Sequence, residues 1–416
     1  MKFRVEREVL GEAVSWVARA LPTRPVVPVL SGLLVRADTS GLTLSCFDYE
    51  VSARVVVAAD VGEPGAALVP GRLLADITRS LPQDQVEVTS VADMVMLTCG
   101  SAEFALVSLA LAEYPKLPEL PDVIGVADGG ALAVAAAQVV PSASRDDTLP
   151  MLTAVCLDID GHAMTLAATD RYRLAVRTIG WDSADAGLRA SALVPARTLA
   201  DMAKTMAAGV PVTIAFGQPG GEPSAGSQPP IGQVRPADGM ISFEGGGRRL
   251  TARLVGGEFI RYESRFPAEF GSSAELPAGP FTEAVRRVAL VADRTSPVEL
   301  TFRPDSVVVE ARSDGRARAV ESVPARFAGE QNVISFNPHW LLDGLTAAAL
   351  SGHEDGPDAA AAGAGSIRLE FTSPAKPALI TWAGDGKPDG DDGAADRQGA
   401  RSFRYLLVPL RAPGSG

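Results

Sequence analysis

The chain alternates between segments whose apolar residues recur every three to four positions and segments in which apolar and polar residues alternate. The first pattern predicts helices, and the second predicts half-buried strands. Three of the predicted helices begin beside a proline, in VPGRLL from Val69, VPARTL from Val194 and FNPHWL from Phe336, and proline is favoured in the first turn of a helix. In all, helices are predicted at residues 7–20, 70–81, 130–145, 195–208, 280–295 and 338–350.

The order helix, strands, helix, strands occurs three times at a spacing of about 125 residues, which suits a domain and is too long for a solenoid repeat. We therefore predict an α+β fold of three tandem copies, at residues 1–124, 125–270 and 271–416. Each copy should hold two antiparallel sheets with two helices on one side. Strands are predicted at 29–37, 42–47 and 51–60 in the first copy, and the turn residues of the three copies are Gly41 and Asp48, Gly161 and Asp170, and Pro304 and Gly315.

Three segments interrupt this pattern, at residues 217–239, 351–365 and 383–400. They are rich in Gly, Pro, Ala and Asp, which is typical of loops that cannot bury a core of their own. Since each lies between predicted strands, or between a helix and a strand, we interpret them as solvated insertions and not as a site.

The formal net charge of −12 argues against nucleic-acid binding. The six predicted helices nevertheless carry ten basic and seven acidic residues, so they sum to +3 and the remaining residues to −15. This division favours helices that face a polyanion such as DNA. Arginines on an ordinary solvated helix face are the alternative. Arginine outnumbers lysine by 33 to 5, which is typical of a GC-rich bacterial genome.

No segment predicts a membrane span or an export signal. The longest apolar runs, such as ALAVAAAQVV from Ala131, fall short of the ~20 residues that a spanning helix needs, and MKFRVERE has no hydrophobic region of a signal peptide. The cysteines Cys46, Cys99 and Cys156 lie in strand-like segments without CxxC spacing. We therefore expect buried free thiols in a reducing cytoplasm.

The sequence contains no convincing set of catalytic residues. Its three histidines are isolated and lack the spacing of metal ligands. Asp158 and Asp160 alternate in a predicted strand, so both should lie on one solvent-facing side and not form a metal site. The EGGGRR run at Glu244 joins two strands, which favours a glycine hairpin over a phosphate-binding loop. We therefore expect that the protein is not an enzyme and that it binds neither a metal ion nor a cofactor.

Several motifs resemble the bacterial DNA polymerase III β sliding clamp family, in its actinobacterial type. They occur in order in all three copies: MKFRVERE, LPTRPVVPVLSGLLV, VPGRLLADITRSLP, TLPMLTAVCLDIDG with ATDRYRLAV, VPARTLADMAKTM, FNPHWLLDGL and YLLVPLR. The resemblance implies a cytoplasmic, non-catalytic homodimer that closes as a ring around duplex DNA. It also implies that a clamp loader mounts the ring, which then gives processivity to the replicative polymerase and tethers repair factors.

A clamp must hold DNA without reading its sequence, and contacts from Arg and Lys to phosphates serve that purpose. Arg24 matches a DNA-contacting position of the family. Arg79, Arg145, Arg197 and Lys204 are plausible companions on or near the helices. By family position, the dimer interface would join the first copy of one subunit to the third copy of the other. Its residues would be Ile77, Phe104 and Leu106 on one side and Leu290 on the other.

Partners of the family, including the α subunit of DNA polymerase III, insert a short clamp-binding peptide between the second and third domains. An apolar cleft with a few orienting polar groups suits this role. Leu152, Leu174 and Leu406 are also explained as core residues of strands. The resemblance places the pocket at Leu152, Thr169, Arg171, Tyr172, Arg173, Leu174, Ile260, Arg265, Asn337, Trp340, Pro377, Leu406, Val408 and Leu410.

Two pocket positions depart from the family pattern. Ile260 stands where most clamps have proline, as EYPKLP of the first copy does at Pro115, and Arg265 replaces an apolar residue. One hypothesis is a resistance clamp, altered so that a cyclic-peptide inhibitor no longer binds well. A second alternative is an interaction scaffold that is built of the same domains but does not encircle DNA.

Overall fold

The computed structural model describes residues 1–206, 209–217, 239–293, 296–313, 315–355, 365–384 and 403–410. The predicted insertions fall largely outside these ranges. Within them the chain forms four antiparallel sheets and six α-helices, so the predicted α+β class is confirmed. The residues separate into two compact units, which consist of 1–130, 182–185 and 204–254, and of 131–181, 186–203 and 255–416.

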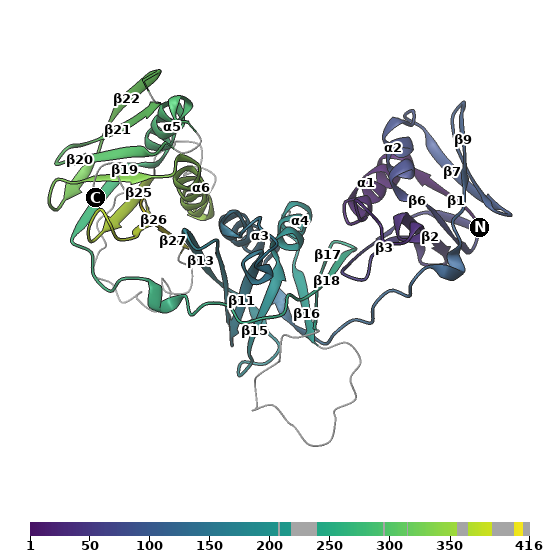
Figure 1. Ribbon diagram of the computed structural model, residues 1–416. Coiled ribbons are helices and arrows are strands. Elements are labelled where there is room, and N and C mark those ends of the chain that lie inside the picture. Colours follow the sequence, from purple (N-terminus) through teal and green to yellow (C-terminus); the bar gives the residue numbers. More distant parts are fainter. Residues whose placement is uncertain are drawn as a thin grey trace. The chain divides into compact units, whose positions relative to one another are not determined.

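The six helices occur two to a copy, as predicted (Figure 1). At the start of the last helix, the Asn337 side chain accepts hydrogen bonds from the backbone N–H groups of His339 and Trp340, which satisfies two otherwise unpaired donors. The helices are α1 (Arg7–Ala18), α2 (Gly71–Ser80), α3 (Gly129–Val139), α4 (Ala196–Met206), α5 (Ala278–Val288) and α6 (Pro338–Ala349).

Two helices end several residues before their predicted ends. The helix predicted at 130–145 ends at Val139 and continues as one 3-10 turn, η3 (Val140–Ser142), because Pro141 cannot supply a backbone N–H. Arg145 therefore lies outside any helix. The helix predicted at 280–295 ends at Val288 and is followed by the turn η6 (Ala289–Val291). Since α1 also ends before Arg19, the α-helices carry seven basic and six acidic residues, so their positive excess is smaller than predicted.

The first unit contains a five-stranded sheet and a nine-stranded sheet. The five-stranded sheet has the order β5-β1-β7-β8-β9, and the nine-stranded sheet has the order β14-β10-β16-β17-β18-β4-β3-β2-β6. The strands are β1 (Lys2–Glu6), β2 (Gly32–Asp38), β3 (Gly41–Phe47), β4 (Val51–Val57), β5 (Asp60–Glu63), β6 (Gly65–Pro70), β7 (Gln85–Val91), β8 (Met94–Cys99), β9 (Ala102–Val107), β10 (Val123–Ala127), β14 (Asp182–Ser183), β16 (Val212–Gly217), β17 (Met240–Gly245) and β18 (Arg248–Arg253).

The second unit contains a nine-stranded sheet and a four-stranded sheet. Their orders are β15-β11-β12-β13-β27-β26-β25-β19-β23 and β22-β21-β20-β24. The strands are β11 (Ala154–Asp160), β12 (Ala163–Thr169), β13 (Arg173–Gly180), β15 (Arg189–Pro195), β19 (Ser272–Pro277), β20 (Val298–Arg303), β21 (Ser306–Ser313), β22 (Ala317–Pro324), β23 (Arg326–Ala328), β24 (Val333–Phe336), β25 (Ser366–Phe371), β26 (Ala378–Gly384) and β27 (Phe403–Leu407).

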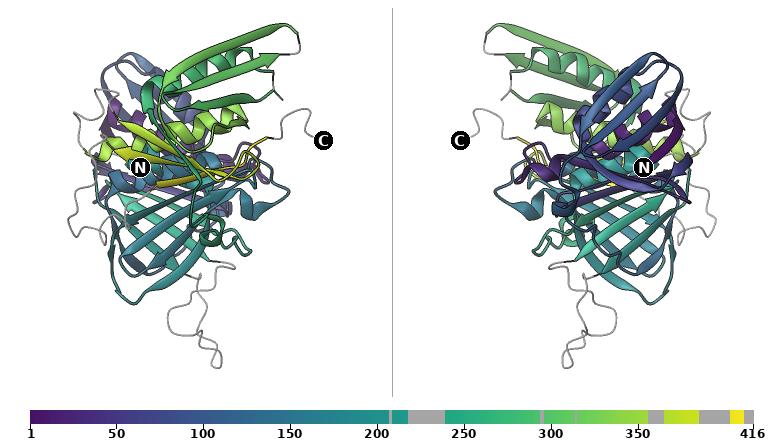
Figure 2. Two further views of the ribbon diagram at one scale, coloured as in Figure 1. Left: turned by 90° about the vertical axis from the view of Figure 1, so that its left-hand side faces the viewer. Right: turned by 90° about the vertical axis from the view of Figure 1, so that its right-hand side faces the viewer.

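The sheets are not confined to single copies, contrary to the prediction of two sheets per copy. Each nine-stranded sheet joins a five-stranded block of one copy to a four-stranded block of another. The joining pairs are β18 with β4, which we call the first junction, and β27 with β13, which we call the second junction. Among the described residues, no strand pairs with the outer edges of β9 and β22 (Figure 2).

Equivalent turns repeat the same local chemistry. Asp48 and Asp170 each accept two backbone N–H groups of the residues that follow. The next residues, Tyr49 and Arg171, adopt positive φ values of 75° and 81°, which an Asx turn can support. One predicted strand start is wrong. Residues Pro28–Ser31 form a 3-10 turn, so the strand predicted at 29–37 begins only at Gly32.

Candidate functional site

A cavity of about 530 Å³ lies at the second junction. Strand β13 and strand β27 form its floor, and the connection between the second and third copies, residues 255–270, forms one wall. Its lining residues are Leu152, Thr169, Arg171, Arg173, Leu174, Ile260, Ser264, Arg265, Pro377, Leu406 and Val408. The size and the mixed lining suit a short peptide or a ligand of similar size.

The floor is an apolar row across three neighbouring strands. Leu174 lies directly opposite Leu406, which lies opposite Leu379. All three are buried and belong to one hydrophobic cluster with Cys156 and Val176. Leu152 contributes from the 3-10 turn η4 (Pro150–Leu152) and not from a strand as predicted. Part of the row faces the cavity, so an apolar ligand group placed there would cover hydrophobic surface.

The wall is held against the sheet by aromatic side chains. Phe259, Tyr262 and Phe266 pack against the same cluster, and the Tyr262 hydroxyl donates a 2.7 Å hydrogen bond to Asp158. Burial and this hydrogen bond raise the pKa of Tyr262. Asp158 was predicted to face solvent together with Asp160. The structure instead places it half-buried beneath the connection, because a strand pattern does not reveal what covers its outer face.

A second contact fixes the same wall. The guanidinium of Arg404 lies 4.3 Å from the centre of the Phe266 ring, within the range of a cation–π interaction. Burial lowers the pKa of Arg404. Tyr262 and Phe266 therefore tie both ends of the 3-10 turn η5 (Glu263–Arg265) to the sheet. Ile260 and Arg265 keep their positions at the cavity because of these anchors.

The polar end of the cavity is built on Arg173. Its Nε donates to Asp170 at 2.9 Å, and its two terminal nitrogens donate to Asp343 and to the carbonyl oxygen of Pro141. The Arg173 side chain is only 9% exposed. Burial lowers its pKa, but the neighbouring Tyr405, Asp343 and Asp170 outweigh burial and raise it. These contacts link β13 to α6, so the network makes this end of the cavity rigid.

The structure brings together ten of the fourteen residues predicted for the pocket, and it adds Ser264. Tyr172 and Trp340 stand outside the cavity lining and stack on each other with their rings 4.9 Å apart. Asn337 caps α6, and Leu410 bonds through its backbone N–H to the carbonyl of Ser335. No sequence pattern indicates Ser264, because this residue lies in the connection between the second and third copies, outside any regular strand or α-helix.

Comparison with known proteins decides the family. Three family models match consecutive parts of the chain: the N-terminal domain of the DNA polymerase III beta subunit at residues 1–118, its central domain at 128–260 and its C-terminal domain at 263–354. The chain belongs to the bacterial β sliding clamp family. Members of this family are non-catalytic processivity factors of DNA polymerase III, and this is the function of the chain.

Two Streptomyces relatives are similar to this chain in sequence along its whole length. The chain is 45% identical to the beta sliding clamp of Streptomyces coelicolor, with 100% of both chains covered. It is 41% identical to the beta sliding clamp homolog GriR of Streptomyces muensis, with 99% of both covered. Family membership implies DNA and a DNA polymerase as partners.

Solved clamp structures share the fold. The sliding clamp of Bacillus subtilis superposes with a TM-score of 0.81 at 23% identity, covering 99% of this chain and 100% of that chain. A clamp of Pseudomonas aeruginosa, solved bound to griselimycin, gives a TM-score of 0.79 at 23% identity, with 99% and 100% covered.

The residues predicted to face DNA in the clamp are all exposed. Arg24 lies in the loop before η1 (Pro28–Ser31). Arg79 lies in the last turn of α2, Arg197 and Lys204 lie on α4, and Arg145 follows η3. Arg79 and Arg197 have only loose ion pairs within their own helices, at 3.4 and 3.9 Å. Their charges therefore remain available to a polyanion.

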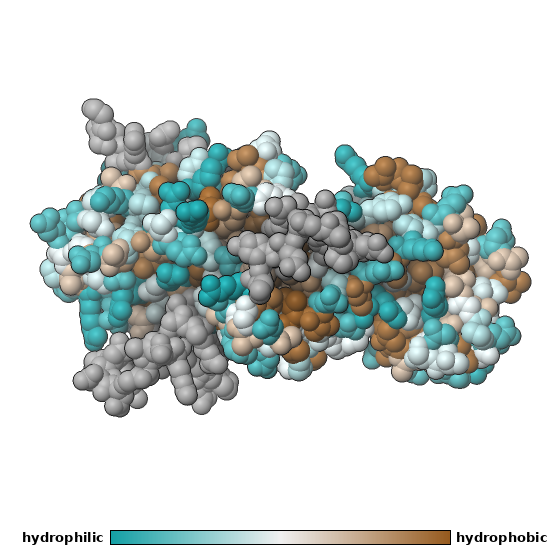
Figure 3. All heavy atoms as spheres, turned by 90° about the horizontal axis from the view of Figure 1, so that it is seen from below, coloured by the Kyte–Doolittle hydropathy of each residue, from teal (hydrophilic) through white to brown (hydrophobic). Residues whose placement is uncertain are grey.

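The residues predicted for the dimer interface of the clamp differ in burial. Leu290 in η6 is 82% exposed, whereas Ile77 and Leu106 are largely buried within the subunit and Phe104 is half-buried. On the face of the molecule shown in Figure 3, hydrophobic side chains gather in separate patches between hydrophilic ones. An exposed leucine is common on protein surfaces. The exposure of Leu290 alone therefore does not identify an interface, and the open sheet edges are needed as well.

Other predicted features are also located. Cys46, Cys99 and Cys156 are buried free thiols, as predicted, and burial raises the pKa of Cys46 to about 12. The EGGGRR run forms the predicted hairpin, with positive φ at Gly246 and Gly247. Within the described ranges no group of three potential ligands could hold a metal ion, and no helix is long and apolar enough to cross a membrane.

Proposed function

We propose that two copies of this clamp subunit close head to tail into a ring around duplex DNA. The observation that carries this proposal is the strand count of the sheets. Each junction inside the chain joins a five-stranded block to a four-stranded block. One five-stranded sheet ending in β9 and one four-stranded sheet ending in β22 remain. Joining these edges between two copies would form a third nine-stranded sheet and leave neither edge open.

The interface residues follow from the same joint. Leu290 would meet Ile77, Phe104 and Leu106 of the second copy. Replacing Leu290 with Asp would place a charge in an apolar contact, so we expect the Leu290→Asp variant to be monomeric at micromolar concentration in light scattering. A variant that stays dimeric would show that Leu290 lies outside the interface.

We propose that Arg24, Arg79, Arg145, Arg197 and Lys204 hold the phosphates of the encircled DNA. Their exposure and weak internal pairing support this role, and such contacts give weak, sequence-independent and salt-dependent binding. The double variant Arg24→Ala, Arg79→Ala should slide off linearised DNA faster than the parent while remaining dimeric. Equal rates of loss from linearised DNA at several salt concentrations would remove both residues from the DNA face.

We also propose that the cavity at the second junction receives the clamp-binding peptide of the polymerase and of other partners. The apolar floor would take aliphatic and aromatic anchors, and Arg171 could pair with an acidic group of the peptide. A clamp loader that uses the same motif would compete for this cavity. A polymerase-derived peptide should therefore bind in a one-to-one ratio and be displaced by the loader subunit.

A second candidate role is resistance to a cyclic-peptide inhibitor. Ile260 and Arg265 both line the cavity, and a cation beside an apolar cleft disfavours a rigid apolar ligand that would desolvate it. The expected weakening is about 5- to 150-fold, or ~1 to 3 kcal/mol.

The test of the resistance role compares the wild type with the Ile260→Pro, Arg265→Leu double variant. The double variant should bind a macrocyclic clamp inhibitor more tightly, while its affinity for a polymerase-derived peptide changes little. If the macrocycle binds both proteins equally, the resistance role fails and the ordinary clamp function stands.

A further inference from the structure

Directly opposed residues form equivalent rows across the two nine-stranded sheets and the four-stranded sheet. These rows predict how the sheets of two copies would join. Each row starts two residues before the residue that precedes a helix, which is Pro70, Pro195 or Asn337. From there it crosses the sheet from one paired residue to the next. The first row is Leu68, Leu34, Ser45, Arg54, Arg249 and Glu244. The second row is Leu193, Cys156, Ala167, Val176 and Arg404. The third row is Ser335, Glu299, Glu310 and Val320, and it ends at the unpaired edge of β22.

The residue that would continue the third row is Glu103 of β9. In the first row Arg249 is the second residue after a two-residue hairpin turn, since Gly245 pairs with Arg248. Glu103 is likewise the second residue after a two-residue turn, since Cys99 pairs with Ala102. The register of the first junction therefore places Glu103 opposite Val320.

The burial pattern of the two strands agrees with this register. On one face it sets Glu103 opposite Val320 and Ala105 opposite Arg318. All four of these residues are exposed. On the other face it sets the half-buried Phe104 opposite the half-buried Ala319. A slip of one residue would bring exposed side chains to the buried face of the partner strand, which opposes such a slip.

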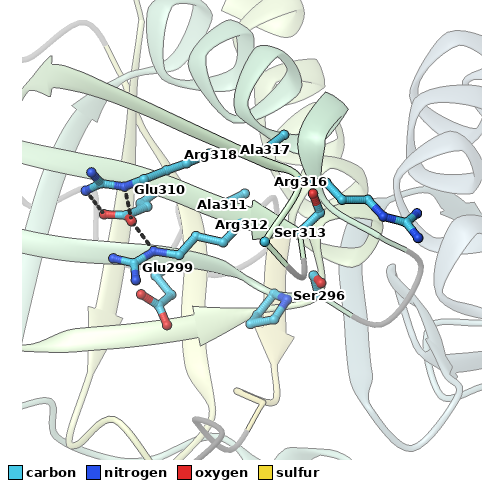
Figure 4. Close-up of a pocket in the computed structure, with 11 residues that line it drawn as sticks. Ser296, Glu299, Glu310, Ala311, Arg312, Ser313, Arg316, Ala317 and Arg318 are labelled. Carbon is cyan, nitrogen blue, oxygen red and sulfur yellow. Dashed lines mark hydrogen bonds and ion pairs between the residues drawn. The ribbon is translucent and has the colours of Figure 1, made fainter.

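A charged cluster stands at this edge and borders a cavity of about 740 Å³ (Figure 4). Glu310 accepts two hydrogen bonds from Arg318, at 2.7 and 3.1 Å, and one from Arg312. Arg312 extends between Glu310 and Glu299, whereas Arg318 reaches Glu310 from the other side (Figure 4). The Arg318 side chain is 61% exposed, so its guanidinium remains accessible to a further partner.

Glu103 has the complementary charge. It is exposed and makes no ion pair with any residue that the structure describes. The residues at its position in the other two rows, Arg249 and Arg404, are both basic. In the transferred register Glu103 lies diagonally across from Arg318, a separation that long side chains span. An acid at Glu103 therefore matches the basic end of the cluster.

We propose that the edge of β22 receives β9 of a second copy with Val320 opposite Glu103, and that Glu103 of the second copy joins Arg318, Arg312 and Glu310 in one ion-pair cluster. This proposal rests on the proposed dimer and adds its register and its selectivity. The cluster makes the edge favour partners that are acidic at the position of Glu103. A clamp with a basic residue there would meet Arg318 with a like charge, so the chain selects further copies of itself.

The first experiment is a charge swap, read out as the dissociation constant of the dimer. The Glu103→Arg variant should dimerise at least about tenfold more weakly than the wild type. The Arg318→Glu variant should also be weakened, and an equimolar mixture of the two variants should form heterodimers at low ionic strength, because both joints are then complementary. Thr98→Val, one strand away on β8, is the control that should leave the dissociation constant unchanged.

The second experiment tests the register without relying on charge. Ala105→Cys with Arg318→Cys should form an intersubunit disulfide under mild oxidation, because directly opposed residues come within disulfide distance. Ala105→Cys with Val320→Cys is the matched pair for a slip of two residues and should cross-link poorly. Both variants retain the three buried cysteines, which serve as an internal background.

The outcomes separate this inference from the proposed function. A wild-type chain that remains monomeric removes the proposed ring and the inference with it. A wild-type dimer that Glu103→Arg leaves equally tight keeps the ring and removes the ion-pair cluster. Efficient cross-linking of the slipped pair in place of the predicted pair overturns the register.

Discussion

At the first junction β18 pairs with β4, and at the second junction β27 pairs with β13 in the same register. The side chains along equivalent rows nevertheless differ. The first junction has Ser52 opposite Thr251 and Thr251 opposite Ser242, where the second has Leu174, Leu406 and Leu379. All six are buried. The repeated backbone therefore fixes where strands meet, and the side chains decide what each junction can bind.

Two hydroxyls of the polar row bond to each other. Thr251 donates a 3.1 Å hydrogen bond to Ser242. Tyr114, in the connection between the first and second copies, accepts a 2.7 Å hydrogen bond from the backbone N–H of Phe47, which pairs with Ser52. The apolar row forms no hydrogen bonds through its side chains and part of it faces a cavity. Hydroxyls that already bond to each other offer a ligand little to gain, whereas an apolar row beside a cavity provides a binding surface.

The largest expected effect concerns Arg173, which stands where the first junction has Val51. Replacing Arg173 with Val removes a buried guanidinium and leaves Asp170 without its ion pair. We expect a loss of about 3 to 5 kcal/mol in the free energy of unfolding, measured by urea denaturation. Adding Asp170→Asn should recover part of this loss. If the single variant is as stable as the wild type, the network does not stabilise the second junction.

The next prediction places a polar residue in the apolar row of the second junction and an apolar residue in the polar row of the first. Leu406→Thr at the second junction should lower the free energy of unfolding by about 2 to 4 kcal/mol and weaken a polymerase-derived peptide by at least about tenfold. Thr251→Val at the equivalent position of the first junction is the matched control. It should cost about 1 kcal/mol and leave the peptide affinity unchanged. Equal losses of peptide affinity in both variants would contradict a special role for the apolar row.

A smaller effect tests the wall of the cavity. Tyr262→Phe removes the hydroxyl that bonds to Asp158, and we expect about 1 to 2 kcal/mol less stability together with a several-fold weaker peptide. Tyr114→Phe, on the equivalent connection of the first junction, is the control. It removes the contact to Phe47 and should reduce stability alone. Titration calorimetry with one peptide distinguishes the two variants, and an unchanged affinity of Tyr262→Phe would show that Ile260 and Arg265 do not depend on this anchor.

Local patterns predicted most of the helices, and physical reasons explain where they failed. The starts of α2, α4 and α6 follow from a proline or asparagine before a run of helical period. The helix predicted at 130–145 extends too far because Pro141 interrupts the helical hydrogen bonding, and the strand predicted at 29–37 begins too early because residues Pro28–Ser31 form a 3-10 turn. The pairing of β27 with β13 is non-local, so the sequence alone could not reveal that sheets cross from copy to copy.

The cavity shows a similar limit. Ten of its lining residues were predicted from the resemblance to a family, and not from their own pattern, since Leu174 and Leu406 also satisfy the pattern of core strands. The bond from Tyr262 to Asp158 and the position of Ser264 depend on how an irregular connection folds over a sheet. No periodicity encodes such a contact, and only the three-dimensional structure reveals which outer faces are covered.

The smallest effect concerns Glu310, which stands where the first and second copies have Ser45 and Ala167. The hydrogen bonds from Arg318 and Arg312 lower the pKa of Glu310 from 4.5 to about 2. A carboxylate with a lowered pKa in the folded state stabilises the protein fully above pH 4.5, and this contribution is lost as the pH falls toward 2. Because both arginines are largely exposed, the contribution should be below about 1 kcal/mol.

The stability difference between the wild type and Glu310→Gln should therefore be larger at pH 6 than at pH 3.5 in urea denaturation. Both should be measured in the monomeric Leu290→Asp background, which separates the folding of the subunit from dimerisation. A difference that is constant over this range would mean that Glu310 titrates normally and that the cluster at the β22 edge is not formed in the free subunit.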